Sequence, residues 1–183
     1  MIKLQKDMDL LIRQETEEDH KAVFELIALA FAGQTYSDKS EHFLVERLRR
    51  SDCFIAELSL VAVLDGDIVG NILISSVKIV NELSSFDSLS LAPVSVLLVF
   101  QKRGIGSKLI NTAHKIAKDL GHSTIVLLGH ASYYPRFGYH KCSDFDITLP
   151  FDSSDDNCMI VELYKNALEG VSGEVIYPPV FFG

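Results

Sequence analysis

The stretch from residue 94 to residue 110, VSVLLVFQKRGIGSKLI, constrains the fold more than any other part of the chain. Its first half is apolar and rich in β-branched residues, as expected for a strand that is covered on both faces of a sheet. A short polar turn with two glycines follows. The apolar residues after the turn recur at helical spacing: Ile105, Leu109, Ile110, Ala113, Ile116, Ala117 and Leu120. The stretch therefore predicts a buried strand, a tight turn and the start of an amphipathic helix.

The turn of this stretch predicts an anion-binding site. The first backbone N–H groups of a helix have no acceptors within the helix, and they lie at the positive end of the helix dipole. Gln101, Lys102 and Arg103 add hydrogen-bond donors and two positive charges at the same place. A strand, turn and helix built in this way favour a phosphate or a pyrophosphate as the ligand.

Length and charge limit the class of protein. At 183 residues the chain is expected to form a single domain, 1–183, with a core from about residue 10 to 165 and the tail 166–183 packed on it. The net charge of −8 argues against a nucleic-acid-binding protein.

The first nine residues contain no apolar signal-peptide core, and no run approaches the roughly 20 apolar residues of a membrane helix. The three cysteines are widely spaced and match neither a disulfide framework nor a metal site. We therefore expect a cytoplasmic protein that binds no metal, no membrane and no nucleic acid.

The remaining pattern predicts a mixed α/β fold. Helices are expected between Thr16 and Gly33, from about 40 to 50 and from about 104 to 120. Asp65-Gly66 between two apolar runs is typical of a β-hairpin. Strands are expected at 10–14, 59–64, 68–80, 89–100, 124–128, 146–149 and 159–163. The segment 94–128 then forms a β-α-β unit with a parallel pair of strands.

Two standard nucleotide-binding motifs do not fit the turn. A dinucleotide fingerprint that begins at Gly104 needs a third glycine at position 109, where this chain has Leu109. A P-loop needs Gly-Lys-Ser/Thr at its end, and Gly106 is followed by Ser-Lys, in the opposite order. The anion site is therefore of another kind.

Gln101-x-x-Gly104-x-Gly106, placed between an apolar strand and an amphipathic helix, resembles the pyrophosphate loop of the GCN5-related N-acetyltransferases. The chain is most similar to a bacterial subgroup of small acetyltransferases in that family. The stretches that carry this resemblance run from residue 10 to about 180: Arg13-Gln-Glu15, Leu58-Ser-Leu-Val-Ala62, Asp65-Gly-Asp-Ile-Val-Gly70, Gly104-Ile-Gly106, Leu128-Gly-His130, Tyr133-Tyr-Pro-Arg-Phe-Gly-Tyr139, Gly170-Val-Ser-Gly173 and Tyr177-Pro-Pro179. The chain departs from the family at two positions, with Leu98 where a proline is frequent and Lys102 where a small residue is usual.

The resemblance implies a fold and a cosubstrate. The implied fold is a mixed central sheet of about six to seven strands, flanked by about four helices, with two parallel strands that splay apart at the cofactor cleft. The implied cosubstrate is acetyl-CoA, whose pantetheine arm pairs with the edge of the strand around Val94 to Val96. A backbone N–H near Val96 can then polarise the thioester carbonyl. The expected cofactor-binding residues are Val94, Val96, Gln101, Lys102, Arg103, Gly104, Ile105, Gly106 and Ser107.

Tyr134 lies four residues before Gly138, at the position of the family's general acid, and a phenol can protonate the departing thiolate. A packing role for Tyr134 among its aromatic neighbours is the alternative. The base that accepts the proton of the amine stays open between Glu82, His130, His140 and ordered water, although a structural role is favoured for His130. His114 and His122 are expected at the surface, and Cys142 is expected to be a small buried hydrophobe.

Three functions follow from this pattern. The first is an acetyl-CoA-dependent N-acetyltransferase that acts on a primary amine of a small molecule or a protein by direct attack in a ternary complex. The second is a non-catalytic sensor or docking module that binds CoA or acyl-CoA, and the third is a phosphate-binding domain for an unrelated nucleotide. Four acids suit a cationic acceptor, although charged runs are usually solvated: Glu15, Glu41, Glu46 and Asp87. The sequence does not distinguish a monomer from a homodimer.

Overall fold

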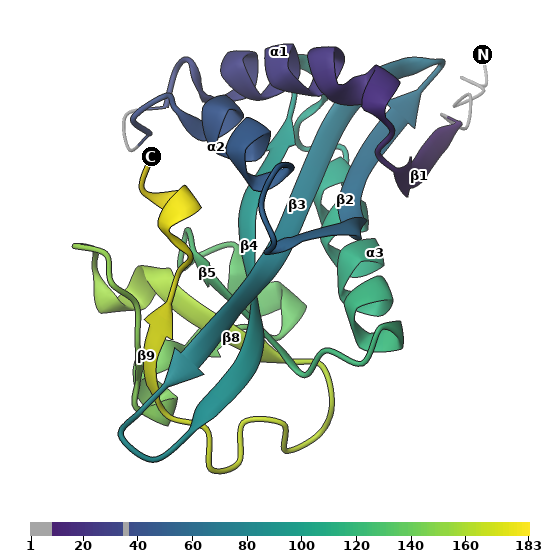
Figure 1. Ribbon diagram of the computed structural model, residues 1–183. Coiled ribbons are helices and arrows are strands. Elements are labelled where there is room, and N and C mark those ends of the chain that lie inside the picture. Colours follow the sequence, from purple (N-terminus) through teal and green to yellow (C-terminus); the bar gives the residue numbers. More distant parts are fainter. Residues whose placement is uncertain (1–8, 35–36) are drawn as a thin grey trace.

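The computed structural model describes residues 9–34 and 37–183, which form a mixed α/β fold around one twisted sheet (Figure 1). The first eight residues, where no signal-peptide core was expected, lie outside the described residues. Along the main path of the sheet the strands follow the order β1-β2-β3-β4-β5-β8-β6, while β9 pairs with both β3 and β7. The strands are β1 (Leu10–Gln14), β2 (Phe54–Leu64), β3 (Asp67–Val80), β4 (Ser85–Val96), β5 (Thr124–Leu128), β6 (His140–Lys141), β7 (Ile147–Thr148), β8 (Cys158–Glu162) and β9 (Gly173–Ile176).

The helices lie on both faces of this sheet. The described part of the chain contains α1 (His20–Phe31), α2 (Glu41–Leu48) and α3 (Ile105–Asp119), one helix fewer than the expected four. It contains nine strands in place of six or seven, because the two short strands β6 and β9 were not anticipated. In Figure 1, α1 and α2 cover one face of the sheet and α3 lies against the other.

The apolar stripes of the helices form the core. On α3 the buried residues are Ile105, Leu109, Ile110, Ala113 and Ala117, as the periodicity predicts. They pack with β2, β3 and β4 in one cluster. On the opposite face Val23, Leu26 and Ile27 of α1 pack with Leu73 of β3 and with Val45 of α2. The central strands are therefore covered on both sides.

The predicted hairpin at Asp65-Gly66 is confirmed. Leu64 of β2 pairs with Asp67 of β3, so the loop has two residues. Their φ angles are 51° at Asp65 and 93° at Gly66. Both angles are positive, as the tight turn that matches the twist of the two strands requires, and glycine and aspartate tolerate this conformation.

The strand predicted at 89–100 ends earlier than expected. β4 stops at Val96, and residues Leu98–Phe100 form a 3₁₀ turn in which Leu98 is 62% and Val99 71% exposed. Leu97 still donates its N–H to Val69 O at 3.0 Å, but the N–H of Phe100 bonds back to Leu97 O at 2.8 Å. The chain leaves the sheet here because it must turn towards α3. The apolar composition of the segment does not show where the strand ends.

The C-terminal residues pack against the end of β3. β9 runs antiparallel to the end of β3, with Lys78 opposite Ile176 and Val80 opposite Glu174. Val175 is fully buried and Tyr177 is 7% exposed. Farther along the tail, Val180 O accepts a hydrogen bond from Arg47 Nε of α2 at 3.0 Å.

Candidate active site

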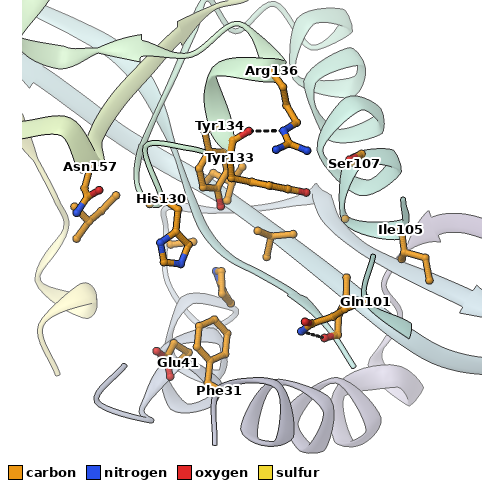
Figure 2. Close-up of a pocket in the computed structure, with 18 of the residues that line it drawn as sticks. Phe31, Glu41, Gln101, Ile105, Ser107, His130, Tyr133, Tyr134, Arg136 and Asn157 are labelled. Carbon is orange, nitrogen blue, oxygen red and sulfur yellow. Dashed lines mark hydrogen bonds between the residues drawn. The ribbon is translucent and has the colours of Figure 1, made fainter. Parts of the chain in front are cut away.

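The two parallel strands β4 and β5 separate soon after they pair. The paired residues are Leu89 with Ile125 and Ser90 with Val126, after which β4 continues to Val96 along a different direction. β4 also contains a β-bulge, because three steps from Leu91 to Val94 oppose only two steps on β3. Bulges of this kind bend a strand and are frequent beside active sites. The separation of the strands leaves a cavity of about 1070 Å³ between them (Figure 2).

Most of the predicted cofactor residues line this cavity. Eight of the nine contribute to its wall: Val94, Val96, Gln101, Lys102, Gly104, Ile105, Gly106 and Ser107. The ninth, Arg103, lies beside the wall with its guanidinium carbon 5.4 Å from the centre of the Phe100 ring. One cavity thus brings the strand edge and the loop together.

The loop 101–107 presents backbone N–H groups at the start of α3. The first N–H of the helix with an intrahelical acceptor is that of Lys108, which bonds to Gly104 O at 3.0 Å. The N–H groups of residues 105–107 therefore have no acceptor within the helix. Gly104 is the N-cap and has φ of 80°, and Lys102 has φ of 60°. Lys102 thus takes a left-handed conformation at the position where the family usually has a small residue.

The edge of β4 that faces the cavity carries the N–H of Val96. Leu97 donates its N–H to β3, and successive residues of an extended strand direct their N–H groups to opposite edges. The N–H and the C=O of Val96 therefore both lie on the edge away from β3. Gln101 Nε2 donates to Val96 O at 3.0 Å on that edge, which also fixes the loop to the strand.

Tyr134 forms part of the cavity wall opposite β4. It begins the 3₁₀ turn Tyr134–Phe137 and is 8% exposed. Its ring lies 5.2 Å from that of Tyr133 and 5.6 Å from that of Tyr139, both in edge-on geometry. Tyr134 therefore belongs to an aromatic cluster and faces the cavity at the same time, so its packing does not exclude a chemical role.

Tyr139 connects this cluster to α3 through His114. The two side chains are joined by a hydrogen bond of 3.0 Å between His114 Nε2 and Tyr139 Oη. Burial lowers the pKa of His114 to about 4 and raises the pKa of Tyr139 well above its usual value. The expectation that His114 lies at the surface is wrong, because its position on α3 borders the buried stripe and faces Tyr139. His122 is half-buried as well, and burial lowers its pKa.

The structure separates the three side chains considered as the base. Glu82 is exposed in the turn between β3 and β4, outside the cavity wall. His140 is exposed on β6, where its ring contacts Phe145 at 6.4 Å between centroids. Only His130 of the three lines the cavity.

The sequence did not place several residues at the cavity. Arg136 donates from Nε to Tyr133 O at 2.8 Å, and its guanidinium carbon lies 4.6 Å from the centre of the Tyr133 ring. Phe31 at the end of α1 and Glu41 at the start of α2 also line the cavity. Glu41 was expected only as one of four acids that suit a cationic acceptor, and Phe31 belongs to no motif. No sequence signal therefore placed either of them at the cavity. Pro93, by contrast, was a usable sign of the bulge, because proline is rare inside a regular strand.

Cys142 behaves as the small buried hydrophobe that was expected. Burial raises the pKa of its thiol to about 12, so the thiol stays protonated and is a poor nucleophile. Among the described residues, no three side chains of His, Cys, Asp or Glu are grouped so as to hold a metal ion. No helix in the described ranges is long and apolar enough to cross a membrane.

Comparison with known proteins identifies the family. Residues 11–142, well over half of the chain, match the model of the acetyltransferase (GNAT) domain. The chain belongs to the GNAT acetyltransferase family. By family it is an acyltransferase of the N-acetyltransferase class, and the resemblance carried by the loop 101–107 and by Tyr133 to Tyr139 is confirmed.

Two curated relatives come from Escherichia coli strain K12. The uncharacterized N-acetyltransferase YhbS is 27% identical over 169 residues, which cover 92% of this chain and 96% of YhbS. The uncharacterized N-acetyltransferase YjhQ is 34% identical over 110 residues, which cover 60% of this chain and 61% of YjhQ. The match to YjhQ thus spans less than two thirds of that protein.

Solved GNAT structures share the fold. A family acetyltransferase from Brucella melitensis, in complex with acetyl-CoA, has a TM-score of 0.77 at 29% identity and covers 94% of this chain and 97% of its own. Escherichia coli YhbS, in complex with CoA, has a TM-score of 0.85 at 24% identity over 96% and 93% of the two chains. These likenesses confirm the predicted GNAT fold and support acetyl-CoA as the expected cosubstrate.

Proposed function

We propose that this protein transfers the acetyl group of acetyl-CoA to a primary amine of a small molecule or a protein, by direct attack within a ternary complex. The observation that carries the proposal is the separation of β4 from β5, which opens a cavity with the loop 101–107 at one end and Tyr134 on its wall. The acetyl-CoA and CoA complexes of the two solved relatives support this choice of donor.

The cofactor-binding residues divide between two tasks. The N–H groups of residues 105–107, with Gln101, Lys102 and Arg103 beside them, bind the pyrophosphate at the positive end of the α3 dipole. The free edge of β4 from Val94 to Val96 pairs with the amides of the pantetheine arm, in place of the β5 strand that has turned away. Together they direct the thioester towards Tyr134.

The transfer itself needs an electrophile, a proton donor and a proton acceptor. The neutral amine attacks the thioester carbonyl carbon, and the N–H of Val96 stabilises the negative charge that develops on the oxygen. As the bond between carbon and sulfur breaks, Tyr134 donates its phenolic proton to the thiolate. His130, or water ordered next to it, receives the proton that the nitrogen loses, because His130 is the one of the three considered side chains that lines the cavity. No covalent intermediate with the protein is formed.

The alternative is a non-catalytic module that binds CoA or acyl-CoA. It would use the same loop and strand edge but would not need Tyr134. Tyr134 is buried in the wall of the same cavity that Val94 and Val96 of β4 line, and this favours the catalytic function. The family match argues against the third hypothesis, a domain for an unrelated nucleotide.

Calorimetry and a transfer assay test the proposal. We expect acetyl-CoA to bind, and we expect thiol release to depend on an amine when a broad panel of primary amines is offered. Tyr134→Phe should bind acetyl-CoA normally and lose about 100-fold or more in kcat, since general acids contribute on the order of 10² to 10⁴. Tyr164→Phe, which alters an exposed tyrosine outside the cavity wall, is the control. Binding without transfer to any amine would instead favour the sensor module, and absence of binding would refute both.

We further propose that residues 1–183 act as one acetyltransferase domain, in the cytoplasm, as a monomer or homodimer. The packing of β9 against β3 supports the single domain. Gel filtration with light scattering determines the oligomeric state.

A further inference from the structure

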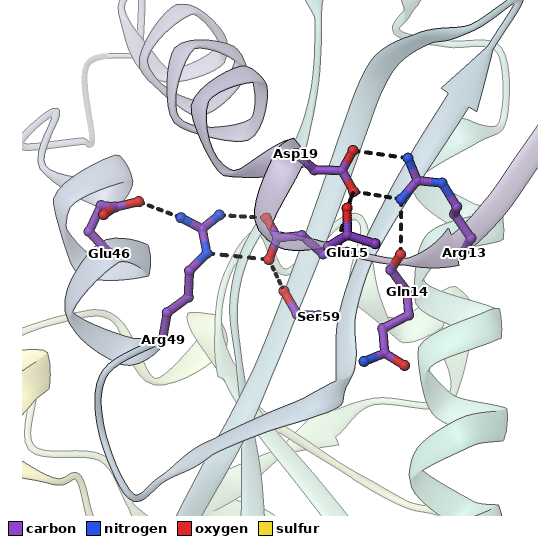
Figure 3. A network of polar contacts seen from close by, with 8 residues as sticks. Arg13, Gln14, Glu15, Asp19, Glu46, Arg49 and Ser59 are labelled. Carbon is purple, nitrogen blue, oxygen red and sulfur yellow. Dashed lines mark hydrogen bonds and ion pairs between the residues drawn. The ribbon is translucent and has the colours of Figure 1, made fainter.

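The four acids that suit a cationic acceptor have very different surroundings in the fold. Glu15 is buried and accepts hydrogen bonds from Arg49 Nη2 at 2.5 Å and from Ser59 Oγ at 2.6 Å (Figure 3). Glu46 accepts from Arg49 Nη1 at 2.5 Å. Asp87 pairs with Lys78 at 2.6 Å on the exposed β3–β4 hairpin. The charges of these three acids are therefore compensated within the protein, outside the cavity.

Glu41 is the exception. It is the first residue of α2, and its side chain lines the cavity. Its Oε2 atom is buried and has no hydrogen-bond partner among the described residues. A buried carboxylate oxygen without a partner is costly, and a bound cation removes that cost. Glu41 thus has the property expected of a group that is completed by a ligand.

Charge is unevenly distributed around the cavity. The cationic residues of its described wall are Lys102 in the loop and Arg136, whose guanidinium packs on the Tyr133 ring. Tyr133 itself lies next to the loop, since a methyl group on Gly106 would be 3.2 Å from Tyr133 Oη. The acidic residues of that wall are Glu41 and Asp152. In Figure 2, Glu41 and Phe31 lie together on the side of α1 and α2, across the cavity from Tyr134 and Arg136. An anionic donor and a cationic acceptor would each meet the opposite charge.

From this arrangement we propose that the acceptor carries a second positive charge besides its reacting amine, and that Glu41 binds this second charge. The inference rests on the proposed acetyl transfer. The reacting nitrogen must be neutral when it attacks, so a carboxylate that binds a separate ammonium aligns the acceptor without opposing the attack. Phe31, half-buried beside Glu41, provides an apolar surface for the carbon chain between the two charges. The substrate class is therefore a diamine, or an amine next to another cationic group.

Three acceptors of equal length test this specificity: 1,5-diaminopentane, 5-amino-1-pentanol and 5-aminopentanoate. They present a positive charge, a neutral hydroxyl and a negative charge at the end that does not react. We expect the wild-type kcat/KM to be at least about tenfold higher for the diamine than for the alcohol, and lowest for the carboxylate, because a desolvated charge pair favours one sign strongly.

Substitution of Glu41 assigns this preference to one side chain. Glu41→Gln should raise KM for the diamine about tenfold or more, while kcat, the Kd for acetyl-CoA and the kcat/KM for the alcohol stay within about twofold. Glu41→Lys should reverse the order of the diamine and the carboxylate. Glu25→Gln, which makes the same change at an exposed position of α1, should leave all three acceptors unchanged.

Two outcomes would overturn the inference while leaving the acetyltransferase function intact. One is amine-dependent transfer with no preference for the diamine over the alcohol. The other is a Glu41→Gln variant that loses the same factor on all three acceptors, which indicates damage to the fold or to the donor site. Failure of the wild type to transfer to any amine of the broad panel would instead refute the proposed function itself.

Discussion

The ring of Tyr134 packs directly against the backbone of Gly129. A methyl group on the Gly129 Cα would lie 2.3 Å from Tyr134 Cε2 and 2.9 Å from Cδ2, far closer than two carbon atoms can approach. Gly129 directly follows the end of β5, and its N–H bonds to Asn157 O at 2.9 Å. The absence of a side chain at this position therefore allows the ring of Tyr134 to occupy the cavity wall.

This contact predicts that Gly129→Ala displaces the phenol without removing it. We expect kcat to fall about tenfold or more, since misplacement of a reacting group by about 1 Å can cost on the order of 10² in rate. Acetyl-CoA binding should change little, because the loop 101–107 is not touched. Steady-state kinetics and calorimetry measure the two effects. Gly33→Ala is the matched control, since an added methyl group there meets nothing within 4 Å, and an equal loss of rate in both variants would contradict the prediction.

Lys102 combines a left-handed backbone with a charge beside the proposed pyrophosphate site. Lys102→Gly should raise the free energy of unfolding by up to about 1 kcal/mol, because glycine adopts a φ of 60° without steric cost. The same change should weaken acetyl-CoA binding a few-fold, since a cation near the phosphates is removed. Urea denaturation should thus show a higher stability, while calorimetry should show a lower affinity for acetyl-CoA. Lys102→Ala, which loses the charge and keeps the strain, should weaken binding without the gain in stability.

The half-buried His114 predicts that the stability of the fold depends on pH. Its pKa is about 4 in the folded protein against an ordinary 6.5. Between these values the unfolded chain binds a proton that the folded chain does not. The free energy of unfolding therefore falls as the pH drops from 6.5 to 4, and the full contribution of His114 is present above pH 6.5. The loss from this residue amounts to at most about 3 kcal/mol.

His114→Gln removes the titrating group and retains a partner for Tyr139. We expect its free energy of unfolding to depend less on pH in this window than that of the wild type, as measured by urea denaturation at intervals between pH 4 and 7. His122→Gln, at a more exposed site, should flatten the curve much less. A wild-type curve that is already flat between pH 4 and 6.5 would refute the assignment.

Arg49 neutralises the buried Glu15 and fixes α2 to β1 and β2. The side chains of Arg49 and Glu15 are only 5% and 3% exposed. Arg49→Leu should lower the free energy of unfolding by about 3–5 kcal/mol, because it leaves the carboxylate of Glu15 buried without its charged partner. Arg50→Leu, whose side chain is 81% exposed, should cost less than about 1 kcal/mol. The double variant Glu15→Gln with Arg49→Leu should recover part of the loss, and additive losses would contradict the proposed pairing.

Local patterns in the chain predicted most of the elements. The apolar stripe of α3, the two-residue hairpin at Asp65-Gly66 and all seven expected strands are present, because each depends on the periodicity and the turn residues of a short segment. The loop 101–107 was predictable for the same reason, since strand, turn and helix follow each other directly. The end of β4 was not, because the apolar residues Leu98 and Val99 lie in an exposed turn whose position depends on where α3 packs.

The sequence by itself predicted an anion site at the start of a helix and a candidate acid in Tyr134, and through its motifs it determined the acetyltransferase family. Only the tertiary structure decided which polar side chains surround that acid. Phe31 and Glu41 line the same cavity as Tyr134, although more than 90 residues separate them from it along the chain. Glu82 and His140 lie outside the cavity wall. Ion pairs neutralise three further acids, which are Glu15, Glu46 and Asp87. The physical reason is that a charged side chain acquires its role from its partners and its burial, and packing brings those partners from distant segments.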